Sequence, residues 1–75
     1  MWKTVYIAND IVLANNLKKN LKNNGIQTVL NTLDIGKDEL DGNVEILVPK
    51  TEIKEALDII NKVLIYENIL LEDLD

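Results

Sequence analysis

The sequence predicts an α+β fold, a ferredoxin-like split βαβ sandwich in which two helices cover one face of an antiparallel sheet. Two segments with apolar residues at helical spacing alternate with three short β-branched segments, in the order βαββα, and there is room for a short fourth strand. The chain has 75 residues, 47% of them apolar and 28% charged, which is typical of one small domain. We expect a single domain over residues 1–66 and an acidic, apolar tail over residues 67–75.

The first strand and the first helix have clear signals. Residues 4–8 are mostly β-branched or aromatic and predict a strand. Asn9 or Asp10 can accept a free backbone N–H and so begin a helix. Gly25 follows as the expected left-handed stop. The apolar side chains of this helix recur at helical spacing: Ile11, Ala14, Leu17 and Leu21.

Two further strands and a loop follow. The alternating segment 26–31 predicts the second strand. Residues 33–43 contain turn formers and four acids, and predict a loop with room for one short helical turn. Residues 44–48 predict the third strand, which should end at Pro49 because proline has no N–H to donate to a neighbouring strand.

The second helix is predicted to begin after Thr51, whose hydroxyl can cap it, with Glu52 and Glu55 in the first turn. Its inward face is expected to consist of Ile53, Ala56, Leu57, Ile60 and Leu64. No glycine or proline marks its end. The tail 67–75 is therefore left open between a short fourth strand, an added helical turn and a partly ordered peptide.

Strand alternation predicts which residues face the helices. We expect the first and third strands to be central and parallel, joined to the helices by right-handed crossovers. The inward residues are then Val5, Ile7, Val44, Ile46 and Val48. Thr4, Ala8 and Glu45 should lie on the opposite face. An apolar interaction surface is predicted on that face, consisting of Trp2, Tyr6, Val29 and Leu47. The alternative is that Ile69, Leu70 and Leu71 of the tail cover this surface within the same chain.

Composition excludes several classes of function. The chain has no Cys, His or Arg, which excludes disulfides, Cys/His zinc sites and imidazole-activated nucleophiles. Its 13 acids and 8 lysines give a net charge of −5, so a nucleic-acid partner is not expected. The first residues lack the pattern of a signal peptide, and no apolar run approaches the ~20 residues of a membrane span. We therefore expect a cytoplasmic protein without membrane contact.

No catalytic, cofactor or metal site is expected. The acidic loop residues Asp34, Asp38, Glu39 and Asp41 could hold a hard cation, but they lack the spacing and central glycine of a calcium loop. A solvated loop is the preferred interpretation. The segment Gly36-Lys37-Asp38 lacks the hydroxyl residue and the earlier glycine of a phosphate-binding loop. A domain of this size also rarely has the dry cleft that acid–base catalysis requires.

Two sets of residues carry a family resemblance. The first half has the pattern Tyr6-x-Ala8-Asn9, a helix with Ala14, Leu17 and Leu21, and then Gly25-Ile26; the second has Val44-x-Ile46-x-Val48-Pro49 and a helix with Ala56-Leu57 and Ile60. Over roughly residues 4–62 the chain resembles the putative prokaryotic signal-transducing protein family. The resemblance implies a ferredoxin-like fold related to the PII nitrogen-signalling proteins and a regulatory role. It departs from the family at Leu13, where an acidic residue is usual, and it has no counterpart of the PII nucleotide-binding residues.

Two functional hypotheses follow. The first is a non-catalytic regulatory or signal-transducing domain that binds a protein partner or a small effector. The second is a structural module that forms a homodimer through the sheet face or an edge strand. Self-association that does not respond to metabolites would favour the second hypothesis, and ligand-dependent thermal stabilisation would favour the first.

Overall fold

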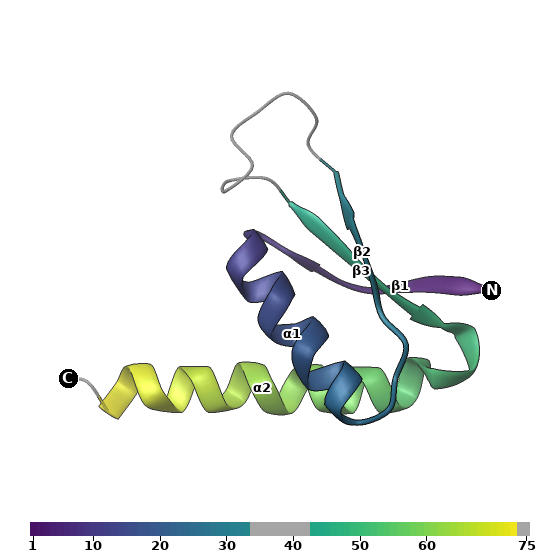
Figure 1. Ribbon diagram of the computed structural model, residues 1–75. Helices are drawn as coiled ribbons and strands as arrows, with labels where there is room; N and C mark the ends of the chain where they lie inside the picture. The colour runs from purple at the N-terminus through teal and green to yellow at the C-terminus, as the bar shows by residue number, and fades with distance from the viewer. Residues whose placement is uncertain (34–42, 74–75) are drawn as a thin grey trace.

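The computed structural model contains a three-stranded sheet with two helices packed on one side of it (Figure 1). The structure describes residues 1–33 and 43–73, with side chains through residue 69. The elements are β1 (Trp2–Ala8), α1 (Ile11–Asn23), β2 (Val29–Thr32), β3 (Val44–Pro49), a short 3₁₀ turn (Lys50–Glu52) and α2 (Ile53–Asp73). This arrangement confirms the predicted α+β, ferredoxin-like fold class.

The strands lie in the order β1-β3-β2, and β3 is antiparallel to both neighbours. The expectation that the first and third strands run parallel is wrong. Because β1 reaches β2 through the crossover helix α1, these two strands are the parallel pair, and β3 returns from β2 to lie between them. Of the two strands expected to be central, only β3 is. No fourth strand is present among the described residues, since the stretch that would supply it continues α2.

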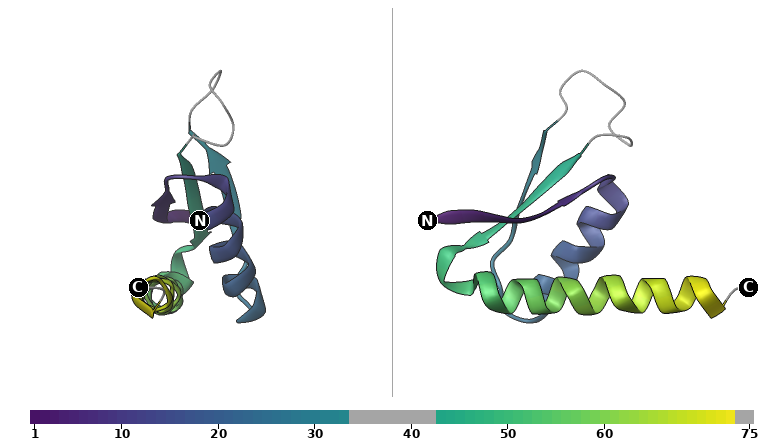
Figure 2. Two further views of the ribbon diagram at one scale, coloured as in Figure 1. Left: turned by 90° about the vertical axis from the view of Figure 1, so that its left-hand side faces the viewer. Right: turned by 180° about the vertical axis from the view of Figure 1, so that it is seen from behind.

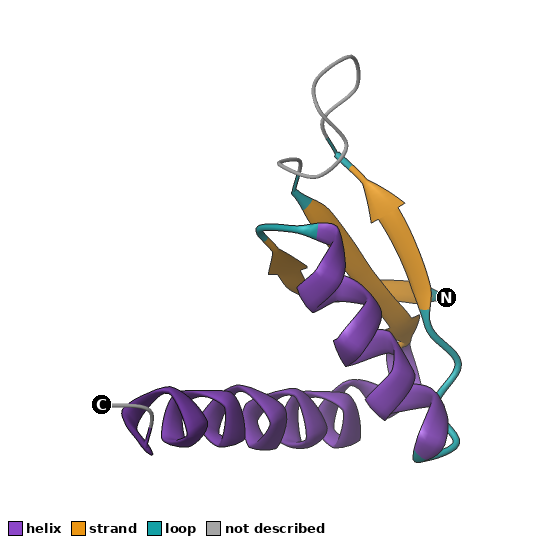
Figure 3. Cartoon of the chain, turned by 60° about the vertical axis from the view of Figure 1, so that its left-hand side comes forward, coloured by secondary structure: helices purple, strands orange, loops and turns teal. Residues whose placement is uncertain are grey.

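The core lies between the sheet and both helices. β3 alternates strictly, with Val44, Ile46 and Val48 fully buried, as predicted. Ile46 and Val48 share one cluster with buried residues of both helices, namely Leu17, Leu21, Ala56 and Ile60. A smaller cluster joins Ala8, Ala14 and Val44. Figure 3 shows α1 crossing this face of the sheet, with α2 below it.

A β-bulge in β1 changes which of its residues face the core. Thr4 pairs with Leu47 and Tyr6 pairs with Ile46, so Val5 is an additional residue with no partner on β3. Val5 is half-buried against the core, as predicted. Beyond the bulge the alternation is reversed. The predicted orientations of three residues are therefore wrong: Tyr6 packs against both clusters, Ala8 is fully buried, and Ile7 is 51% exposed on the other face.

Helix α1 begins and ends as its sequence predicts. The Asp10 carboxylate accepts a hydrogen bond from the Leu13 N–H at 2.7 Å, which satisfies one of the free donors of the first turn. At the other end, Gly25 has a φ of 80°, and its N–H donates to the Lys22 carbonyl. The N–H of Ile26 donates to the Leu21 carbonyl, which completes a Schellman motif. Ile26 is thus part of the helix cap, and the second strand starts three residues later than predicted, at Val29.

The Asp10 cap leads to a stability prediction. We expect Asp10→Ala to lower the free energy of unfolding by about 1 kcal/mol, within the ~0.5–2 kcal/mol usual for caps, because the Leu13 N–H loses its acceptor. Asn9→Ala is the matched control, since Asn9 is exposed and is not the capping residue. Urea denaturation of both variants measures the difference. Equal losses in the two variants would contradict the assignment of the cap.

Helix α2 departs from its prediction in two respects. Thr51 does not cap it, because Thr51 lies inside the 3₁₀ turn, which has no side-chain cap. Leu57 is 40% exposed rather than inward, and Ile59 and Val63 pack against the core in addition to the predicted residues. Of the alternatives left open for the tail, the helical one is found among the described residues, since residues 67–73 continue α2 and do not cover the sheet (Figure 1). Within the described part of the chain, no helix combines the length and apolar character needed to cross a membrane.

Candidate functional site

The face of the sheet away from the helices is the main candidate site. We call it the open face, and its residues are Trp2, Thr4, Ile7, Val29, Asn31, Glu45 and Leu47. The register places Leu47 of β3 between Thr4 on one side and Val29 on the other. Trp2, Ile7 and Val29 are large apolar side chains that are 45%, 51% and 44% exposed. Neither of the two described helices lies over this face (Figure 2).

Three of the four predicted surface residues lie on the open face, and one does not. Trp2, Val29 and Leu47 are there, whereas Tyr6 faces the helices because of the bulge at Val5. Ile7 takes the place of Tyr6, opposite Glu45. Sequence alternation could not identify Ile7, because it assumes two residues per repeat without interruption. The sequence contains no glycine or proline near Val5 that would indicate a bulge.

Glu45 lies at the centre of the open face and is held by both neighbouring strands. Its carboxylate accepts a hydrogen bond from the Thr4 hydroxyl on β1. It also accepts one from the Asn31 amide on β2, at 3.1 Å. The hydrogen bond from Thr4, and to a lesser extent the one from Asn31, holds the pKa of the Glu45 carboxyl below its usual value, because both stabilise the charged form. Partial burial acts in the opposite direction and raises this pKa. The open face therefore presents one fixed negative charge with apolar side chains around it.

This pKa shift predicts a measurable pH response. In Thr4→Val the first donor is lost, so we expect the pKa of Glu45 to rise towards its usual value. Because the folded-state pKa is lowered, the stability linked to Glu45 is present above the unfolded-state pKa and is lost as the pH falls through the folded-state pKa. An NMR titration of the Glu45 side chain in the parent and in Thr4→Val measures the shift. Lys3→Val, in the same strand, is the control and should leave the pKa of Glu45 unchanged.

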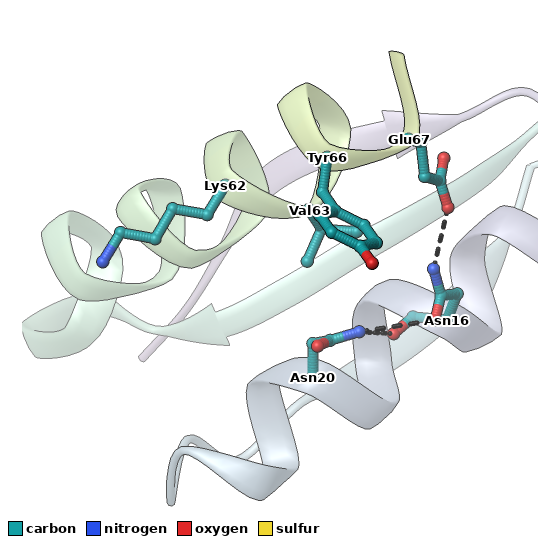
Figure 4. A pocket seen from close by; sticks show the side chains of 6 residues that line it. All are labelled: Asn16, Asn20, Lys62, Val63, Tyr66 and Glu67. Atoms are coloured by element: carbon teal, nitrogen blue, oxygen red, sulfur yellow. Dashed lines mark hydrogen bonds between the residues drawn. The ribbon is translucent and has the colours of Figure 1, made fainter. Parts of the chain in front are cut away.

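A groove between the two helices is a second candidate site (Figure 4). It has a volume of about 510 Å³ and is lined by Asn16, Asn20, Lys62, Val63, Tyr66 and Glu67. The Asn16 amide donates to Glu67 at 2.9 Å and so joins α1 to α2. The Asn20 amide donates to the backbone and side-chain oxygens of Asn16, at 2.8 and 3.3 Å. Tyr66 projects from α2 towards these two amides, whereas Lys62 points away from them.

The groove offers hydrogen-bonding groups beside an apolar wall. Neutral amides, the phenol of Tyr66 and the side chain of Val63 suit a small polar molecule with an apolar part. Sequence analysis missed this site, because Asn16 and Asn20 resemble an ordinary solvated helix face until α2 is placed beside them. Among the described residues, no three carboxylates, cysteines or histidines come together as a metal site would require. The acidic loop residues Asp34, Asp38, Glu39 and Asp41 and the segment 36–38 lie outside the described residues.

Comparison with known families adds to this geometry. A family described as "putative prokaryotic signal transducing protein" matches residues 2–63, which include β1, β2, β3, α1 and the first half of α2. The chain belongs to this family. The family match confirms the resemblance inferred from the paired strand and helix motifs. It covers the whole open face and ends before Tyr66 and Glu67, so the groove is only partly inside the matched region. No curated protein and no solved structure matched the chain.

Proposed function

We propose that this member of the signal-transducing family is a non-catalytic domain that binds a protein partner through its open face. The observation that carries the proposal is the fixed Glu45 carboxylate on a face that the described helices leave uncovered, with exposed Trp2, Ile7 and Val29. Contiguous exposed apolar side chains are a common mark of interaction sites, and aromatic anchors contribute much of the energy at interfaces. The family description supports a role in signal transduction.

The charge of Glu45 indicates the chemistry of the partner. Bringing this carboxylate into an interface without a counter-charge would be costly, because its charged form is the one that Thr4 and Asn31 stabilise. A lysine or arginine of the partner, flanked by apolar side chains, would match both the charge and its surroundings. The net charge of −5 favours a basic protein surface and disfavours nucleic acid. A cytoplasmic location fits this function and is part of the proposal.

Capture from an extract of the native cell tests this function. The immobilised parent and the control Val12→Ser, whose side chain is 72% exposed on α1, should retain the same protein. The double variant Ile7→Ser/Leu47→Ser should lose it, because its open face has lost two apolar contacts. With the partner purified, Glu45→Lys should weaken binding by at least about tenfold, as expected for a like-charge contact. Equal binding by the open-face variants and the parent would overturn the proposal.

A small effector in the groove is a second candidate function, favoured by the convergence of Asn16, Asn20 and Tyr66. A ligand at about 100 times its Kd stabilises the folded state by about 2.7 kcal/mol. Thermal unfolding with a panel of amino acids, nucleotides and sugar phosphates would detect such a ligand. Its stabilising effect should disappear in Asn20→Ala and persist in Asn15→Ala, a matched asparagine of α1 that does not line the groove. A panel without any stabilising member would count against this function.

Homodimerisation through the open face or the edge strand β1 is the alternative to a separate partner. It predicts that the parent is a dimer in sedimentation experiments and that Ile7→Ser/Leu47→Ser is a folded monomer. A dimer that survives this double variant would exclude the open face as the self-association surface.

A further inference from the structure

The groove between α1 and α2 continues into a second hollow at the start of α1. This hollow has a volume of about 460 Å³ and is lined by Asp10, Val12, Leu13, Asn16 and Glu67. It shares Asn16 and Glu67 with the groove, so the two hollows are neighbours along the same side of α1. We call the groove and this hollow together the interhelical crevice.

Hydrogen bonds fix the orientation of both asparagine side chains in the crevice. An ionised carboxylate can only accept hydrogen bonds, so the NH₂ group of Asn16 is the end that points towards Glu67, at 2.9 Å. A backbone carbonyl is also only an acceptor, so the NH₂ group of Asn20 points towards the Asn16 backbone oxygen, at 2.8 Å. The side-chain oxygen of Asn20 is therefore turned away from Asn16 and is open to a ligand.

The crevice offers a ligand three unpaired acceptors. Among the described residues, no hydrogen-bond partner is found for the side-chain oxygen of Asn20 or for the second carboxylate oxygen of Glu67 and of Asp10. Two of these three acceptors carry a negative charge. Lys62 also lines the crevice, but it points away from the asparagines (Figure 4). A positively charged hydrogen-bond donor is therefore the chemistry that matches these groups.

The three acceptors follow one another along α1. Asp10 comes directly before α1, Glu67 is bound to Asn16 six residues later, and Asn20 is one turn further. At about 1.5 Å per residue, the first interval is about 9 Å and the second about 6 Å along the helix axis. A linear molecule with several ammonium groups, joined by short alkyl segments, would match this row.

Apolar and aromatic side chains lie beside the row of acceptors. Leu13 lines the hollow at the start of α1, and Val63 lines the groove, so alkyl segments have apolar surface to contact. The ring of Tyr66 projects towards Asn16 and Asn20 (Figure 4). The face of an aromatic ring attracts an ammonium group, which adds to the preference for a cationic ligand.

We propose that the interhelical crevice binds a linear aliphatic polyamine, with its ammonium groups at Asp10, Glu67 and Asn20. Its alkyl segments lie against Leu13 and the Tyr66 ring. Binding uses ion pairs and hydrogen bonds, and no covalent bond forms or breaks. The proposal rests on the second function given above, a small effector in the groove, and it names the chemical class of that effector. The open face takes no part in it.

Titration calorimetry of the full chain with spermidine tests the proposal. We expect saturable one-to-one binding that weakens at least about tenfold in Glu67→Gln, where a neutral amide oxygen can still accept from Asn16. Asp10→Asn should also weaken binding, and it preserves the helix cap because asparagine caps as well as aspartate. The matched control Asp58→Asn removes the same charge at an exposed site of α2 outside the crevice, and should bind spermidine as the parent does.

Two further measurements locate the ligand and separate it from general attraction to an acidic protein. In NMR spectra the side-chain amide signals of Asn16 and Asn20 should shift on addition of spermidine, whereas those of the exposed Asn15 should not. Putrescine, with one ammonium group fewer, should bind more weakly than spermidine. Mg²⁺ at equal ionic strength should not displace spermidine. Added to the thermal-unfolding panel, spermidine should stabilise the parent and have little effect on Glu67→Gln.

Several results would overturn the polyamine assignment. They are the absence of saturable binding at spermidine concentrations on the order of millimolar, equal affinity of Glu67→Gln and the parent, and equal weakening in Asp58→Asn. If spermidine fails while another member of the panel stabilises the parent but not Asn20→Ala, the groove retains its effector function and the polyamine is the wrong class. The variant Ile7→Ser/Leu47→Ser should bind spermidine normally, so failure of the open-face function and failure of this proposal are distinguishable.

Discussion

Ile46→Ala is expected to lower the free energy of unfolding by about 2–5 kcal/mol, the range for removing a fully buried isoleucine or leucine. Ile46 lies on the central strand β3 and has no exposed surface. It belongs to the one cluster that contacts both helices, so the cavity left by alanine has α1, α2 and β1 around it. The core is a single layer, and these elements cannot all move to fill it. The loss would be a large share of the stability that a domain of this size can have.

Leu17→Ala should have a similar effect from the opposite side of the same cluster, because Leu17 of α1 is also fully buried. Leu57→Ala is the matched control on α2, where the side chain is 40% exposed, and it should cost about 1 kcal/mol or less. Urea denaturation of the three variants, under conditions that keep the oligomeric state constant, measures the differences. Losses below about 0.5 kcal/mol at both Leu17 and Ile46 would contradict the assigned core.

For the first helix and for β3, the sequence was sufficient to predict the element and the residues it buries. The first helix has a carboxylate at its start, apolar residues on one side and a glycine after its last turn. The structure uses each of them: Asp10 accepts the Leu13 N–H, Leu17 and Leu21 are buried, and Gly25 adopts a positive φ. β3 was equally predictable, because its three valine and isoleucine residues alternate without interruption. These elements depend on neighbours within a few positions in the chain.

Several of the errors arose where the decisive interaction is distant in sequence. The length of α2 could not be predicted, because neither glycine nor proline marks its end and the tail suits a helix or a strand equally. Strand direction was misassigned because the crossover through α1 makes β1 parallel to β2, and β3 returns to lie between them, antiparallel to both. The groove depends on Asn16 meeting Glu67, 51 positions away. The open face itself was predictable from β3 and β2, since Leu47 and Val29 follow simple alternation and pair across the strands.

The bulge at Val5 accounts for the wrong orientations predicted in β1 and leads to an opposite pair of effects at neighbouring residues. Tyr6 packs against both core clusters, whereas Ile7 is 51% exposed on the open face. Tyr6→Glu should therefore unfold the domain or lower its stability by several kcal/mol, because a carboxylate would be placed among apolar side chains without a partner. Uninterrupted alternation would predict the reverse, with the greater loss at Ile7.

Ile7→Glu is the informative companion variant. Its side chain would be solvated, although it would lie opposite Glu45, and like charges directly across a strand pair destabilise modestly, by about 0.2–1 kcal/mol. Ile7→Gln removes that repulsion and separates it from the loss of the apolar side chain. Circular dichroism and urea denaturation should show folded protein for both Ile7 variants and a severe loss for Tyr6→Glu. If Tyr6→Glu were as stable as Ile7→Gln, Tyr6 would have to lie on the open face, and β1 would have to pair with β3 without a bulge.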